Sequence, residues 1–86
     1  MSISSGIRTS SAQIRDEECW LEGAILTDGS VDSIVIFYDS ADDDLASKLE
    51  VGYISQAVPY FKHSVHCRYG LYAEIEEGAE YMVITN

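Results

Sequence analysis

Residues with the right atoms for a metal site gather near position 65. His63, His66 and Cys67, together with Cys19 elsewhere in the chain, could supply a Cys2His2 zinc site. The alternation around them predicts a strand, and on a strand residues at odd spacing point to opposite faces. The spacing therefore argues against zinc. We expect His63 on the covered face of the strand, His66 on its solvent face, and no bound metal.

A run of carboxylates around position 42 suggests calcium instead. Counting Asp39 as position 1 of a calcium loop places Asp43 at position 5 and Glu50 at position 12. Position 3 is Ala41, and position 6 is Asp44 where such a loop needs glycine for its sharp turn. The same residues make a good helix start, because acidic side chains are favourable in a first turn. We favour the helix.

Nothing in the chain points to catalysis. A cysteine or serine nucleophile needs an adjacent base, and no nucleophile elbow is present. The glycines are dispersed, so they form neither a phosphate-cradling loop nor a dinucleotide fingerprint. We expect a protein that is not an enzyme and has no cofactor. Cys19 and Cys67 are expected to be buried free thiols, with a single disulfide as the alternative.

The charge balance limits the partners. The chain has 86 residues, 15 Asp and Glu against 5 Lys and Arg, a formal net charge of −10 and a pI of about 4.2. Direct binding to DNA, RNA or an anionic membrane is disfavoured, since contact with phosphates depends on basic side chains. The longest apolar run, 34–38, is far too short for a membrane helix, and no secretory signal is apparent. We expect a cytoplasmic protein.

The acidic residues and tyrosines are the strongest functional signal. Carboxylates two apart on a strand, or three to four apart on a helix, form rows of negative charge, and tyrosine is enriched at binding hot spots. The tyrosines 60, 72 and 81 are predicted to point away from the core. The predicted partner-binding residues are Asp42, Asp43, Asp44, Glu50, Tyr72, Glu74, Glu76, Glu80 and Tyr81.

The pattern of apolar residues predicts the elements that carry these groups. Two strands over 19–27 and 33–38 flank Asp28-Gly29, which is a strong hairpin signal. Ser40 as an N-cap, with Leu45 and Leu49 at helical spacing, predicts an amphipathic helix over about 41–51.

The remainder of the chain predicts three more strands. Alternation over 61–69 places Phe61, His63, Val65, Cys67 and Tyr69 on one face. Strands over 71–76 and 81–85 follow, the first with Tyr72, Glu74 and Glu76 outside and the second with Met82 and Ile84 inward.

These elements predict an α+β fold, a small antiparallel sheet of about five strands with one amphipathic helix on one face, in the order β-β-α-β-β-β. Residues 1–10 are predicted to be a flexible Ser-rich arm, frayed or bound to a sheet edge, and residues 11–86 a single acidic domain.

We therefore expect a small acidic binding protein that inhibits a basic, nucleic-acid-handling protein by occupying its binding surface. Phage anti-CRISPR and anti-restriction proteins, DNA mimics and nuclease immunity proteins share this size and charge, although no family motif is present. The alternative is a structural or assembly protein that forms a homodimer or larger homo-oligomer through an open sheet edge.

Overall fold

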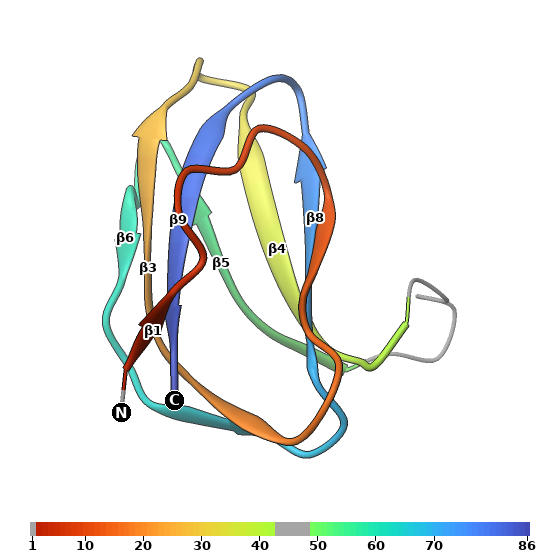
Figure 1. Ribbon diagram of the computed structural model, residues 1–86. Helices are drawn as coiled ribbons and strands as arrows, with labels where there is room; N and C mark the ends of the chain where they lie inside the picture. The colour runs from red at the N-terminus through yellow and green to blue at the C-terminus, as the bar shows by residue number, and fades with distance from the viewer. Residues whose placement is uncertain (1, 43–48) are drawn as a thin grey trace.

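Two antiparallel sheets enclose the core in the computed structural model, which describes residues 2–42 and 49–86 (Figure 1). The strands of the described residues are β1 (Ile3–Ser4), β2 (Ala12–Arg15), β3 (Cys19–Asp28), β4 (Ile34–Asp39), β5 (Leu49–Ser55), β6 (Tyr60–Phe61), β7 (Val65–Cys67), β8 (Leu71–Glu76) and β9 (Glu80–Thr85). Sheet A has the order β1-β9-β3-β6, with β7 also paired to β3, and sheet B has the order β2-β8-β4-β5.

The predicted α+β class is wrong, because the described residues contain no helix and form an all-β structure. The core lies between the two sheets. Its largest fully buried side chains come from both layers: Leu21, Tyr81 and Val83 from sheet A, and Val35, Phe37, Ile54 and Leu71 from sheet B.

The helix predicted over 41–51 is contradicted where the structure describes that segment. Residues 43–48, which include Leu45, lie outside the described residues, but Leu49 begins strand β5 and is 68% exposed. Leu49 is therefore not an anchor for a helix. The Ser40 hydroxyl does cap a backbone N–H, that of Asp42 at 3.1 Å. It closes a turn after β4, since the capping hydroxyl of serine serves turns as well as helices.

The predicted hairpin between the strands over 19–27 and 33–38 is also wrong. Strands β3 and β4 belong to different sheets, so the connection at 29–33 crosses from one layer to the other. The buried Ser33 hydroxyl holds this connection: it accepts a hydrogen bond from the N–H of Ser30 and donates one to the carbonyl of Gly78, both at 2.9 Å. An Asp-Gly pair marks a turn correctly but does not specify which strands pair.

In sheet B, the alternation predicted for β8 is confirmed, and β4 alternates in the same way. Strand β4 lies between β8 and β5 and is therefore an inner strand of this sheet. The side chains that point into the core are Val35, Phe37, Leu71 and Ala73.

In sheet A, the predicted inward face of β9 is wrong by one residue. Tyr81, Val83 and Thr85 are buried, whereas Met82 and Ile84 lie on the outer side. A shift of one position exchanges the two faces of a strand. The polar tips of the buried residues have partners: the Tyr81 hydroxyl donates to the carbonyl of Ser10 at 2.6 Å, and the Thr85 hydroxyl accepts from Arg15 at 3.3 Å.

The strand predicted over 61–69 is two short strands, β6 and β7, separated by residues 62–64. His63 and Tyr69 are exposed, so their predicted place on a covered face is wrong. Cys67 is buried and His66 is exposed, and these neighbours therefore point to opposite faces.

The N-terminal residues lie along strand β9. Strand β1 pairs with β9, and Arg8 forms an isolated bridge with Tyr81. The Ser5 hydroxyl accepts a hydrogen bond from the N–H of Val83 at 2.9 Å. Among the described residues, none belongs to a helix long and apolar enough to cross a membrane.

Candidate functional site

The outer face of sheet B brings together four of the residues predicted to bind a partner. On the central strand β4, Ile34, Ile36 and Tyr38 point outward because Val35 and Phe37 point into the core. The register places Glu76, Glu74 and Tyr72 of β8 directly opposite these three outward residues. Glu50 of β5 lies opposite Tyr38 from the other side. We call this surface, made of Ile34, Ile36, Tyr38, Glu50, Tyr72, Glu74 and Glu76, the tyrosine–carboxylate face.

Burial and the carboxylates of this face raise the pKa of the Tyr38 hydroxyl. Partial burial raises the pKa of the Tyr38 hydroxyl above its ordinary value, and the carboxylates of Glu74, Glu50 and Glu76 raise it further. A negative charge disfavours the ionised form of a neighbouring acid. The register agrees, because Glu50 lies opposite Tyr38, Glu74 opposite Ile36 and Glu76 opposite Ile34.

The carboxylates of the face have no cationic partner within the described part of the chain. The contacts there between basic and acidic side chains join Arg15 to Glu17 at 3.1 Å and His66 to Glu18 at 2.7 Å. Neither pair involves the tyrosine–carboxylate face. The face therefore combines an apolar stripe along β4 with negative charge on both sides that no described residue neutralises.

The other predicted site residues lie elsewhere. Asp42 is exposed in the turn after β4, and Asp43 and Asp44 fall outside the described residues. Glu80 belongs to sheet A, where it is the cross-strand partner of Asp28. The predicted outward orientation of Tyr81 is wrong, because the side chain is fully buried; Tyr81 is thus no part of a binding surface.

Sequence reasoning missed Tyr38 as a site residue. The alternation of 34–38 already placed Tyr38 on one face with Ile34 and Ile36. The sequence did not reveal that β8 and β5 flank β4, and this pairing is what surrounds Tyr38 with carboxylates.

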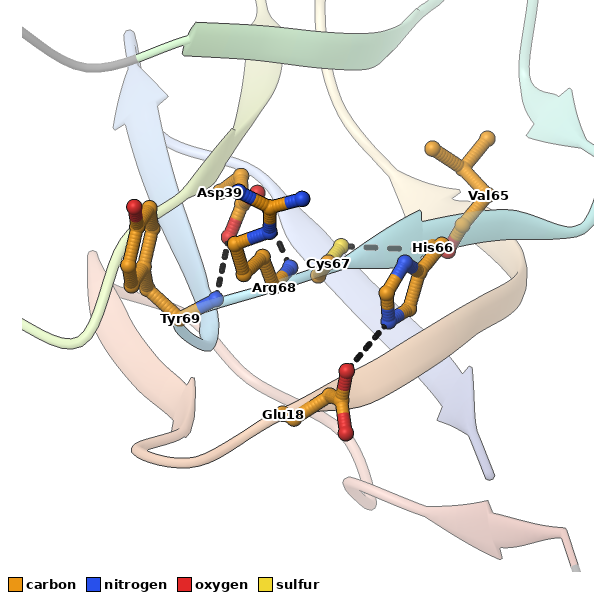
Figure 2. A network of polar contacts seen from close by, with 7 residues as sticks. All are labelled: Glu18, Asp39, Val65, His66, Cys67, Arg68 and Tyr69. Atoms are coloured by element: carbon orange, nitrogen blue, oxygen red, sulfur yellow. Dashed lines mark hydrogen bonds and ion pairs between the residues drawn. The ribbon is translucent and has the colours of Figure 1, made fainter.

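A second polar cluster, at the β7 end of the molecule, has a structural role. The Asp39 carboxylate accepts hydrogen bonds from the backbone N–H groups of Arg68 and Tyr69 at 2.9 and 2.8 Å (Figure 2). This carboxylate holds the turn between β7 and β8, which explains a conspicuous aspartate without calcium. The His66 side chain lies on the other side of β7, where its Nε2 contacts the Glu18 carboxylate (Figure 2). The centroid of the His66 ring lies 4.8 Å from that of the Trp20 ring.

The two cysteines are direct cross-strand partners on β3 and β7, and both are buried free thiols. Burial raises the pKa of the Cys67 thiol to about 12 and also raises that of Cys19. The thiolate is the nucleophilic form, so these thiols are poorly suited to nucleophilic catalysis near neutral pH.

No protein-family model matches this chain, and a search of curated proteins finds no match either.

Proposed function

We propose that this protein is a small acidic binding protein that inhibits a basic, nucleic-acid-handling protein by occupying its binding surface. The tyrosine–carboxylate face is the proposed contact surface. The observation that carries the proposal is the placement of Glu50, Glu74 and Glu76 on the same face as Tyr38, without a cationic partner among the described residues.

The chemistry of the face suits a partner that binds nucleic acid. Glu74 and Glu76 are two residues apart on one strand, which separates their positions by about 6.7 Å. Glu50 adds a third carboxylate across the apolar stripe. Surfaces that bind phosphate backbones carry lysine and arginine, and a row of carboxylates is complementary to them in charge.

In this proposal the tyrosines supply most of the binding affinity. Exposed ion pairs contribute little affinity, whereas aromatic side chains at the centre of an interface often dominate it. Tyr38 and Tyr72 lie side by side, Glu50 lies across from Tyr38, and both tyrosines are half-buried. In this proposal the protein acts in the cytoplasm, without a cofactor and without catalysing a reaction.

The assembly alternative has one observation in its favour. Strands β2 and β5 are the edges of sheet B, and among the described residues each pairs with only one neighbouring strand. Open edges can accept a strand from another copy. Light scattering at high concentration separates the two functions, because an assembly protein forms large particles whereas an inhibitor of this size remains a monomer or a small dimer.

The test of the proposed function compares three immobilised proteins in a lysate of the source cells. These are the wild type, Glu74→Lys/Glu76→Lys, and the control Asp16→Lys/Asp32→Lys. The control makes the same change in net charge at exposed positions outside the face. We expect one basic protein to be retained by the wild type and the control and lost by the face variant, and we expect wild-type protein to displace nucleic acid from it. Equal retention by all three would contradict the proposal.

A further inference from the structure

A pocket of about 400 Å³ lies where the edge strands of the two sheets meet. Tyr53 of β5, Tyr60 and Phe61 of β6, and Val58 between these strands form its apolar wall. Lys62 and His63, which follow β6, complete the lining. Ligand sites in proteins have this size and this mixture of an apolar wall with a few polar groups.

The wall of the pocket depends on a glycine. A Cβ at Gly52 would lie 2.7 Å from Cε2 of Phe61, too close for any larger residue without movement of the ring. The absent side chain lets the Phe61 ring pack directly on strand β5. The His63 ring in turn meets Phe61 edge to face, with 5.4 Å between ring centroids and 75° between planes. Residues of both sheets thereby fix the aromatic surface.

The basic groups at this pocket are not neutralised by neighbours. Lys62 and His63 are both exposed, and no ion pair or side-chain hydrogen bond joins them to another described residue. Arg15 and His66, by contrast, each contact a glutamate. In a chain with a net charge of −10, two adjacent unpaired cationic or protonatable groups beside aromatic rings form a local anion-binding surface.

We propose that this pocket binds a small anionic aromatic molecule, an aryl carboxylate or aryl phosphate. Its ring lies against Tyr53, Tyr60 and Phe61, and its anionic group contacts Lys62 and His63. Aromatic rings favour offset or edge-to-face packing, for which the pocket offers three partners. Its volume corresponds to roughly a dozen water molecules, room for one ring and one acidic group. The site is distinct in chemistry from the tyrosine–carboxylate face, and the proposal does not depend on the proposed function.

The test is an NMR titration of the full chain with two probes that share a ring and differ in charge. 4-Hydroxyphenylacetate carries a carboxylate, and tyramine carries an ammonium group. We expect the acid to shift the amide signals of residues 52–63 and to bind at least fivefold more tightly than the amine. Equal binding of the two probes, or shifts spread over both sheets, would overturn the proposal.

Three variants identify the groups responsible. Lys62→Gln should weaken binding of the acid at least threefold, whereas Arg68→Gln, an equal change in net charge at another exposed position, should leave it within twofold. Val58→Trp should fill the pocket and abolish binding, with the melting temperature as a check on folding. If Arg68→Gln weakens binding as much as Lys62→Gln, the effect is one of overall charge and the assignment of Lys62 is wrong.

Discussion

Tyr38 on β4 and Tyr72 on β8 are direct cross-strand partners on the two inner strands of sheet B, at the end of the ladder that joins them. Their position follows from the core. Because Val35 and Phe37 of β4 and Ala73 of β8 are fully buried, the alternate residues of both strands must point outward. The burial pattern that stabilises sheet B thus also builds the tyrosine–carboxylate face, and this arrangement can be tested without a partner.

The first prediction concerns the ionisation of Tyr38. Glu74 contributes the largest charge effect on its pKa, so Glu74→Gln should lower the pKa of the Tyr38 hydroxyl toward the ordinary value of 10.0. Glu17→Gln, on the Arg15 ion pair, should leave it unchanged. NMR titration of tyrosine ring signals, assigned with Tyr38→Phe, measures the shift. An identical Tyr38 titration in all variants would contradict the geometry of the face.

The second prediction is a loss of stability at alkaline pH. Burial raises the pKa of Tyr81 from 10.0 to about 12, so the folded protein holds this proton more tightly than the unfolded chain does. The contribution of Tyr81 to the free energy of unfolding is therefore complete below pH 10 and is lost as the pH rises through the folded-state pKa. A shift of two pKa units corresponds to about 3 kcal/mol of the free energy of unfolding. The raised pKa of buried Cys67 likewise lowers the free energy of unfolding as the pH rises.

Thermal melts between pH 9 and pH 12 check this effect. Tyr81→Phe removes the ionisable group, and it should show a shallower decline of melting temperature over this range than the wild type, although it loses the hydrogen bond to Ser10. Parallel declines in the two proteins would show that Tyr81 does not titrate in this way.

The third prediction concerns the turn between β7 and β8. Gly70 has a φ of 154°, and a Cβ there would lie 2.6 Å from the carbonyl oxygen of Arg15 and 2.7 Å from that of Ser40. Gly70→Ala should therefore lower the free energy of unfolding by about 3 kcal/mol, because backbone atoms must move. Gly78→Ala is the matched control, since its Cβ would meet no atom within 4 Å, and it should change stability by less than about 0.5 kcal/mol. Denaturant melts of both variants measure the free energy of unfolding, and equal values for the two would contradict the prediction.

The fourth prediction concerns the cysteine pair. Direct partners on antiparallel strands have Cα atoms about 4.5–5.5 Å apart, within the range that a disulfide spans. Prolonged treatment with oxidised glutathione at alkaline pH should therefore join Cys19 to Cys67, slowly because both thiols are buried and have raised pKa values. The bond would close a loop of roughly 48 residues and stabilise the protein by about 4 kcal/mol.

Mass spectrometry should detect the loss of two hydrogen atoms and no attached glutathione, and the melting temperature should rise. Cys19→Ser is the control and should form no such bond. Mixed disulfides with glutathione on both cysteines would contradict the predicted pairing.

Strands with strict alternation were predictable from the sequence, and their partners were not. The alternation over 34–38 separates Val35 and Phe37 from Ile34, Ile36 and Tyr38, and the structure shows that Val35 and Phe37 form the buried face. The choice of partner strand depends on contacts between distant segments, such as Ser33 with Gly78, which have no local signature. Likewise, the inward face of β9 depends on hydrogen bonds that allow Tyr81 and Thr85 to be buried.

The helix prediction failed for a related reason. Ser40 followed by aspartates is a good N-cap pattern, but the same hydroxyl caps a turn here, and residues 49–55 pair with β4 along its whole length. Pairing with a central strand overrides local propensity. For the candidate site, the sequence assigned Glu50 to the predicted helix and Tyr72, Glu74 and Glu76 to a separate strand. Only the sheet order shows that the four residues share one face.

The central claim is that the tyrosine–carboxylate face binds a basic partner, and the most direct measurement is the affinity of that partner for charge-reversed protein at two salt concentrations. Glu74→Lys/Glu76→Lys should weaken binding at least tenfold, about 1.4 kcal/mol, while Asp16→Lys/Asp32→Lys remains close to wild type. The wild-type association rate should also fall as salt is added, because exposed charges are screened beyond about 8 Å at physiological ionic strength. A change of less than about threefold for the face variant, with no dependence on salt, would contradict the account.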